Sequence, residues 1–380
     1  MEPGGNATLS RVSFEGFLDQ VQDGLYVVDR ERRIVFWNRT ATDLTGFAPA
    51  DVLGRTCHDS DLLNHRSTLG QTLCSEEDCP VLRSMLTGDS GTLPYILLMG
   101  TRSGRPLPVS LSVGPLRGPD GGVMGAIVLF RQMREEYQQR RLAMEIQKRM
   151  ITHGCIERGG LRVHTLYHPV DEIGGDFLEA FFLNDGALVA TVADATGHGI
   201  SAALFTMVYK TLLHSSIGRF REPARAMEDI NRGFLRSAGV EGFFLSACIA
   251  TVDPLTMRAV SASAGHPPAL LFGAMEGGGW KLRRTVGRRA PALGIDEEAV
   301  YEDETFPLEP GDLLFLASDG IFESERRDGS PFGVEGVEQF LAGYRGGAPL
   351  EQLLSVLRRE SSLAQLPDDV SAVAVEMIRA

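Results

Sequence analysis

Aspartates at the ends of apolar runs are the residues of this 380-residue chain whose type and spacing could carry chemistry. They are Asp176 after two glycines, Asp194 after ALVATVA, Asp319 after DLLFLAS, and Asp368-Asp369 before VSAVAVEM. A carboxylate at the end of a buried strand has little solvent to stabilise its charge. Carboxylates that converge at one sheet edge therefore repel one another unless cations lie between them. The sequence predicts a metal site.

The donor set indicates which ion this site would take. Aspartate oxygens with no His or Cys at ligand spacing favour hard octahedral ions, so Mg²⁺ or Mn²⁺ fits better than Zn²⁺. We expect two ions, because a carboxylate-bridged pair can activate a water and polarise a phosphoryl oxygen. This chemistry needs no covalent nucleophile, and the sequence shows no Gly-x-Ser-x-Gly elbow, P-loop or cysteine-based phosphate cradle. His198 could donate a proton to a leaving oxygen, or hold its Gly-His-Gly turn through a backbone hydrogen bond.

Strands must position these aspartates. From residue 161 onward, alternating apolar runs joined by tight turns predict antiparallel sheets covered by a few helices. The length predicts two or three domains. We expect an α+β protein with an N-terminal tail over residues 1–12, a first domain over 13–131, a helical linker over 132–158 and a second domain over 159–380.

The first domain has a pattern of two strands, short helices and three further strands. It resembles a PAS sensory domain in the motifs Asp23-Gly24, Val28-Asp29, Trp37-Asn38, Thr45-Gly46-Phe47 and Gly121-Gly122. The resemblance implies a signal sensor or a dimerising platform with no catalysis of its own. An unrelated small α+β domain is the alternative.

Cys57, Cys74 and Cys79 lie within a short stretch of this first domain, with His65 between them. Three thiolates and an imidazole could hold Zn²⁺ or an iron–sulfur cluster, or the thiols could undergo reversible oxidation. Buried structural cysteines are the alternative. The five cysteines of the chain are too few and too sparse for a secreted disulfide framework.

Residues 132–158 are rich in helix-forming residues and predict one long helix. Met133, Tyr137, Met144 and Ile151 keep an approximate 3.5-residue spacing, with Leu142 and Ile146 beside them. This spacing favours a parallel homodimer through the helix. The alternative is a linker helix that lies on the following domain.

The second domain resembles the sporulation stage II protein E family, bacterial relatives of the type 2C metal-dependent Ser/Thr phosphatases. The motifs that carry the resemblance are Ile173-Gly-Gly-Asp-Phe177, Ala193-Asp-Ala-Thr-Gly-His-Gly199, Ala264-Gly-His-Pro-Pro268, Leu293-Gly294, Pro310-Gly-Asp312, Ser318-Asp-Gly-Ile-Phe-Glu323 and Asp368-Asp-Val370. It implies an antiparallel β-sandwich flanked by helices, in which Asp194 bridges two metals beside the carbonyl of Ala195. Asp176, Asp319 and one or both of Asp368 and Asp369 would complete the site.

Together the two resemblances imply a PAS-regulated Ser/Thr phosphatase that acts on a phosphorylated STAS-type anti-sigma-factor antagonist in a partner-switching pathway. A binuclear phosphodiesterase acting on nucleotides and a non-catalytic signalling scaffold are the alternatives. The formal net charge of −13 argues against nucleic acid and anionic membranes as partners. No run approaches 18 apolar residues and the amino terminus has no apolar stretch, so we expect a cytosolic protein.

Overall fold

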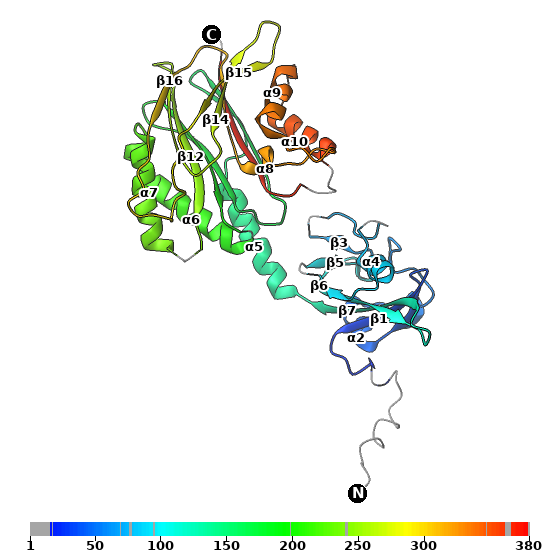
Figure 1. Cartoon of the computed structure of the whole chain (residues 1–380). Coiled ribbons are helices and arrows are strands. Elements are labelled where there is room, and N and C mark those ends of the chain that lie inside the picture. Colours follow the sequence, from blue (N-terminus) through cyan, green and yellow to red (C-terminus); the bar gives the residue numbers. More distant parts are fainter. Residues whose placement is uncertain are drawn as a thin grey trace. The chain divides into compact units, whose positions relative to one another are not determined.

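The structure is a computed structural model, and it divides into two compact units, residues 1–141 and 142–380 (Figure 1). It describes residues 16, 18–68, 70–75, 78–93, 96–197, 199–239, 242–346, 348–361 and 366–378. The predicted tail over residues 1–12 lies outside the described residues. None of the helices in these ranges combines the length and the apolar character needed to cross a bilayer.

The N-terminal unit is built on one antiparallel sheet with strand order β2-β1-β7-β6-β5-β3, with β4 paired to β6. Its strands are β1 Gly24–Asp29, β2 Ile34–Trp37, β3 Arg66–Ser67, β4 Gly91–Thr92, β5 Leu97–Met99, β6 Leu107–Arg117 and β7 Val123–Gln132. Its helices are α2 Arg39–Thr45, α3 Pro49–Val52 and α4 Pro80–Thr87. The predicted two strands, short helices and three further strands are present as β1, β2, α2, α4, β5, β6 and β7, and the short elements α3, β3 and β4 are additions that the prediction lacked.

Asn38 ties the start of α2 to the sheet. Its Oδ1 accepts hydrogen bonds from the backbone N–H groups of Ala41, at 2.8 Å, and Leu25, at 2.9 Å. The first bond caps the helix and the second holds the helix against β1. Gly46 ends α2 in the left-handed conformation, with φ of 77°. The packed aromatic rings of Tyr26, Trp37 and Phe130 fill the core below the helix.

Helix α5, Arg134–Met150, is shorter than predicted. Glu135 and Glu136 lie in its first turn and Lys148 and Arg149 in its last, which complements the helix dipole. The prediction of a helix over residues 132–158 is wrong at its C-terminal end. Residues 154–158 instead form strand β8, Gly154–Arg158, which pairs with β9. Sheet pairing overrides the helical propensity of this short segment.

The C-terminal unit contains two antiparallel sheets with strand orders β10-β11-β12-β13-β16 and β15-β14-β17-β18-β9-β8. Its remaining strands are β9 Leu161–His168, β10 Asp176–Phe182, β11 Leu188–Ala195, β12 Leu245–Asp253, β13 Arg258–Ala264, β14 Ala269–Ala274, β15 Trp280–Val286, β16 Glu304–Pro307, β17 Leu313–Ala317 and β18 Val370–Met377. Its helices are α6 Ile200–Ser215, the 3₁₀ turn η2 Ile217–Arg219, α7 Pro223–Ala238, α8 Asp319–Phe322, α9 Gly333–Gly343 and α10 Pro349–Glu360.

Helices cover the sheets of this unit on both sides (Figure 1). Helices α6 and α7 pack on the five-stranded sheet, and α9 and α10 pack on the six-stranded sheet. One apolar core joins the two sheets and the α6–α7 layer, and a second lies between the six-stranded sheet and α9–α10. The predicted α+β class, with an antiparallel sandwich flanked by helices, is confirmed.

Candidate active site

Both sheets of the C-terminal unit bring an aspartate-bearing end to the site. Asp176 begins β10 and lies opposite Asp194 near the end of β11, as directly paired residues of the ladder. In the other sheet, Asp319 begins α8 just after β17, and Asp368 and Asp369 immediately precede β18. Because β17 pairs antiparallel with β18, the end of one lies beside the start of the other.

The electrostatics of the five carboxylates show that they lie together. Burial and the nearby charges of Asp319, Asp368 and Asp369 raise the pKa of Asp194 to about 7. Burial, Asp194 and Asp369 raise the pKa of Asp176 well above its ordinary value, and burial and Asp368 raise that of Asp319. Each carboxylate thus destabilises the charge of its neighbours, as predicted for a site that needs a cation.

The donor set fits a hard divalent cation. Asp176 is 2% exposed, and its Oδ2 is buried with no hydrogen-bond partner among the described residues. A buried carboxylate oxygen without a donor is costly unless a cation contacts it. In the described part of the chain, no three His, Cys, Asp or Glu side chains are already arranged to hold an ion.

The two members of the terminal acidic pair differ. Asp369 is buried, and its carboxylate accepts hydrogen bonds from the backbone N–H groups of Val170 at 2.8 Å, Gly175 at 2.7 Å and Asp176 at 3.4 Å. Asp368 is exposed, and its Oδ1 accepts the N–H of Asp369 at 2.8 Å. Asp369 therefore holds the loop before β10, whereas the Asp368 side chain is exposed to solvent.

Two glycines let the backbone close around Asp369. A Cβ at Gly174 would lie 2.4 Å from Asp369 Oδ2, and a Cβ at Gly320 would lie 1.9 Å from the Asp369 carbonyl oxygen. Both distances are shorter than any side chain tolerates, so only glycine fits at either position. The glycines that flank the aspartates in the sequence are thus explained by close backbone approach.

Gln147, near the end of α5, contacts this loop and was missed by sequence analysis. It is 4% exposed on an otherwise exposed helix. Its Nε2 donates to the Gly174 carbonyl at 2.7 Å, and its Oε1 accepts the Gly174 N–H at 3.3 Å. A glutamine in a polar helix carries no sequence signal that separates this buried contact from an exposed surface position.

The remaining predicted site residues are placed as follows. Ala195 ends β11, and its N–H donates to the Gly175 carbonyl at 3.1 Å, which puts its peptide beside the same loop. His198 lies outside the described residues. Cys57 and Cys79 are buried in the core of the N-terminal unit, and Cys74 is half-buried.

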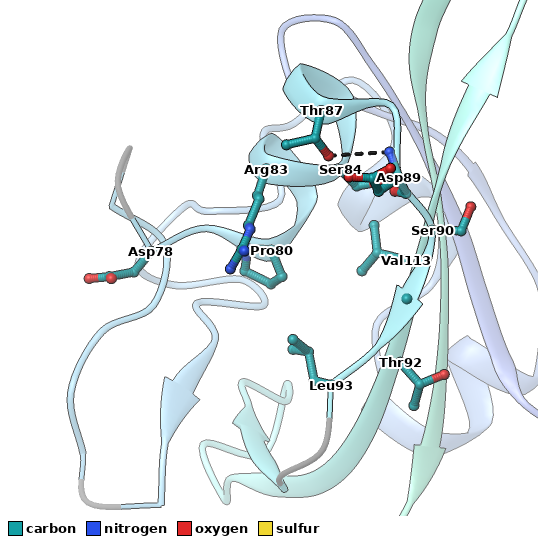
Figure 2. Close-up of a pocket in the computed structure, with 11 residues that line it drawn as sticks. Asp78, Pro80, Arg83, Ser84, Thr87, Asp89, Ser90, Thr92, Leu93 and Val113 are labelled. Atoms are coloured by element: carbon teal, nitrogen blue, oxygen red, sulfur yellow. Dashed lines mark hydrogen bonds between the residues drawn. The ribbon is translucent and has the colours of Figure 1, made fainter. Parts of the chain in front are cut away.

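The N-terminal unit also has an open pocket of about 240 Å³ between α4 and strands β4 and β6 (Figure 2). Polar side chains of Asp78, Arg83, Thr87 and Asp89 lie around it. The Asp89 N–H donates to Thr87 Oγ1 at 3.2 Å and ties the end of α4 to the following turn. None of the residues predicted to carry chemistry lines this pocket.

A family model described as Stage II sporulation protein E (SpoIIE) matches residues 184–378, just over half of the chain. The chain belongs to this family. The family match includes four of the five aspartates, Asp194, Asp319, Asp368 and Asp369. Asp176 lies just before the matched residues and is placed by its pairing with Asp194.

A PAS fold model matches residues 18–138, so the N-terminal unit is a PAS domain.

Curated relatives of this SpoIIE-family chain include the phosphoserine phosphatases RsbP and RsbU of Bacillus subtilis (strain 168), each 23% identical. The matches cover 48% and 50% of this chain, and 44% and 54% of the relatives. The chain thus spans about half the length of the curated relatives it matches.

Two solved structures show the fold of the SpoIIE-family unit. The SiaA-PP2C domain of Pseudomonas aeruginosa is 20% identical, with a TM-score of 0.53, over 64% of this chain and 97% of that one. A structure of SpoIIE from Bacillus subtilis, with its PP2C phosphatase domain and a regulatory fragment, is 18% identical with a TM-score of 0.50. It covers 70% of this chain and 71% of the other. The C-terminal unit therefore has the PP2C fold.

Proposed function

We propose that this chain is a PAS-regulated, metal-dependent protein Ser/Thr phosphatase. The observation that carries the proposal is the convergence of five carboxylates from both sheets, with raised pKa values at the buried members, in a chain of the SpoIIE family. Relatives named phosphoserine phosphatases support the reaction class. Burial of several mutually repelling carboxylates at one place is difficult to explain for a non-catalytic scaffold.

The carboxylates have different proposed roles at the site. Asp194 is central, since its pKa responds to Asp319, Asp368 and Asp369, and it would bridge two Mn²⁺ or Mg²⁺ ions. Asp176, Asp319, Asp368 and the Ala195 carbonyl would complete the ligands, while Asp369 holds the loop. When bound, the ions activate a water and polarise the phosphoryl oxygens.

The start of α6 lies directly after the Asp194 strand and would orient the phosphoryl group. Gly199 caps this helix with φ of 77°, and the free N–H groups of its first turn favour an anion. His198, which precedes Gly199 in the sequence, is the proposed proton donor to the departing serine oxygen.

The proposed substrate is a phosphoserine or phosphothreonine on a STAS-type anti-sigma-factor antagonist. We expect the purified chain with Mn²⁺ to release inorganic phosphate from such a phosphorylated antagonist and to leave a cyclic dinucleotide intact. Assays with Mn²⁺, Mg²⁺ and chelator measure both the substrate class and the ion. Hydrolysis of the cyclic dinucleotide without phosphoprotein turnover would instead identify a nucleotide phosphodiesterase. Absence of turnover of either substrate with either ion would favour the scaffold.

Helix α5 is the proposed dimer interface and regulatory connection. Ile151 of the predicted seam is buried in the core of the C-terminal unit, as the alternative of a helix on the following domain expects. Leu142 and Ile146 lie one turn apart on the helix and are 60% and 42% exposed, which leaves an apolar stripe for a second copy. Gln147, the next residue along the helix, forms hydrogen bonds with both the carbonyl and the N–H of Gly174. Gly174 lies in the loop whose backbone also donates hydrogen bonds to the Asp369 carboxylate. A change in helix pairing would therefore alter the loop that carries Asp176.

Leu142→Glu combined with Ile146→Glu should convert the dimer to a monomer, because paired helices would bring like charges together in the interface. Sedimentation equilibrium measures this change. The matched variant Arg134→Gln with Lys148→Gln lowers the net charge by the same two units at exposed helix positions outside the stripe, and it should stay dimeric. A monomeric unmodified chain, or a dimer that survives the stripe substitutions, would contradict this interface.

A further inference from the structure

A row of four polar side chains crosses the end of the five-stranded sheet that carries Asp194. Asp176 and Asp194 are direct partners in neighbouring strands, and Ser246 of β12 is the direct partner of Asp194 on its other side. Direct partners in an antiparallel sheet share one face, with Cβ atoms about 4.5–5.5 Å apart. His266 continues the row, since its Nδ1 lies 2.8 Å from Ser246 Oγ. A serine hydroxyl and an imidazole therefore lie next in line to the central carboxylate of the proposed site.

His266 lies in the turn Ala264-Gly-His-Pro-Pro268, which leads from β13 of the five-stranded sheet to β14 of the six-stranded sheet. The His266 side chain is 8% exposed, and Ser263 Oγ donates to the His266 carbonyl at 3.2 Å. Gly265 has φ of 66°, and a Cβ there would lie 3.0 Å from the Cβ of Ala292. A hydrogen bond and close packing thus fix the turn and hold the imidazole beside β12.

The Ser246 hydroxyl bonds to the imidazole and not to Asp194. Among the described residues, the contact with His266 is the one hydrogen bond of this hydroxyl, and no hydrogen bond reaches the Asp194 carboxylate. Burial lowers the pKa of His266 to about 3, so the imidazole is neutral and has one N–H. The Ala317 carbonyl acts against burial and favours Nε2 for this N–H, although Nε2 makes no full hydrogen bond among the described residues. Nδ1 then accepts the hydrogen of Ser246.

We infer that His266 is a positioning residue that holds the Ser246 hydroxyl away from Asp194 and so keeps both Asp194 oxygens open to metal ions. The inference rests on the proposed function, in which Asp194 is the shared ligand of two ions. A carboxylate that bridges two ions uses an oxygen for each of them. A neighbouring hydroxyl that donated to one oxygen would compete with the ion for it.

The competing hydrogen bond would be strong because its acceptor is charged. Hydrogen bonds with an ionised partner are about twice as strong as those between neutral groups. A Ser246 hydroxyl released from His266 would therefore turn to the Asp194 carboxylate, its direct partner in the sheet. Capture of the hydroxyl by the imidazole prevents this competition and leaves the carboxylate to the ions.

Mn²⁺ binding to the full chain, measured by electron paramagnetic resonance of the free ion, tests the inference without an activity assay. His266→Leu removes the imidazole and frees the hydroxyl, so we expect the Mn²⁺ affinity to fall about tenfold. Adding Ser246→Ala to this variant removes the competing donor. The double variant should therefore bind Mn²⁺ within about threefold of the unmodified chain. A defect of packing alone would not be repaired by the loss of a second polar group.

Three further variants separate the hydroxyl from the shape of the ring. His266→Asn places an amide oxygen where Nδ1 lies, so it should still accept from Ser246 and keep the Mn²⁺ affinity. Ser246→Ala alone removes the donor, so the Mn²⁺ affinity should be unchanged or higher. Ser261→Ala is the matched control, since it removes a buried hydroxyl of β13 that donates to the Ile249 carbonyl at 3.2 Å. It should lower the free energy of unfolding and leave the Mn²⁺ affinity unchanged.

A folded His266→Leu variant that binds Mn²⁺ as tightly as the unmodified chain would overturn the inference. So would a double variant that binds as weakly as His266→Leu. If His266→Leu does not fold, Ser246→Ala decides, because a loss of about tenfold in its Mn²⁺ affinity would show that the hydroxyl supports the ions and does not compete with them. An unmodified chain that binds no Mn²⁺ would contradict the proposed function itself, and the inference with it.

Discussion

Asp194→Asn is expected to lower metal-dependent phosphate release by about a thousandfold, which corresponds to several kcal/mol of lost transition-state stabilisation. The reason is the central place of Asp194. It is paired directly with Asp176 in the sheet, and the charges of Asp319, Asp368 and Asp369 raise its pKa, so it is the proposed shared ligand of both ions. The measurement is initial-rate phosphate release from the phosphorylated antagonist over a range of Mn²⁺ concentrations.

The same substitution should stabilise the metal-free chain at neutral pH. The pKa of Asp194 is raised from 3.8 to about 7 in the folded chain, so the folded chain binds its proton more tightly than the unfolded chain. The free energy of unfolding therefore falls as the pH rises from about 4 to about 7. Asn carries no charge, so chelator-treated Asp194→Asn should be more stable than the unmodified chain at pH 8 and similar at pH 4.

Measuring both phosphate release and the free energy of unfolding on the same variant separates a loss of catalytic activity from a loss of folding. Urea denaturation at pH 4 and pH 8, with chelator and with Mn²⁺, measures the stability, and Mn²⁺ should stabilise the unmodified chain far more than the variant. Asp328→Asn removes the same charge from an exposed turn of the C-terminal unit and should change neither activity nor stability by a comparable amount. Full activity in Asp194→Asn, or equal loss in Asp328→Asn, would contradict the assignment.

The aspartates could be predicted from sequence because each stands at or next to one end of an apolar strand. Strand ends meet at sheet edges, so alternation and turn residues were enough to predict that Asp194 and Asp319 approach each other. The pairing of Asp176 with Asp194 needed the register, which a short loop between β10 and β11 fixes.

Other features depend on long-range packing that leaves no local pattern. Residues 154–158 carry glutamate and arginine and follow a helix, yet they pair with β9 because that sheet edge is available. The buried position of Gln147 depends on Gly174, a neighbour 27 residues away in the sequence. The different roles of Asp368 and Asp369 likewise depend on backbone N–H groups almost 200 residues earlier.

Asp368→Asn and Asp369→Asn should fail in different ways, although the residues are adjacent. Asp368 is exposed and its carboxylate accepts the N–H of Asp369, so Asp368→Asn should weaken Mn²⁺ activation and leave the melting temperature of the metal-free chain almost unchanged. The Asp369 carboxylate accepts three backbone N–H groups of the 170–176 loop. Asn at 369 loses the charge and replaces one acceptor oxygen with a donor, so we expect a loss of about 2–5 kcal/mol in unfolding free energy.

Thermal unfolding and Mn²⁺ titration of activity, both measured on each variant, distinguish the two roles. High Mn²⁺ should partly restore Asp368→Asn, because the remaining ligands still face the ion. It should not restore Asp369→Asn, since the loop that carries Asp176 is itself displaced. If Asp369→Asn keeps its stability and is restored by Mn²⁺ while Asp368→Asn unfolds, the two assignments are reversed. That outcome would place the metal on the buried member of the pair.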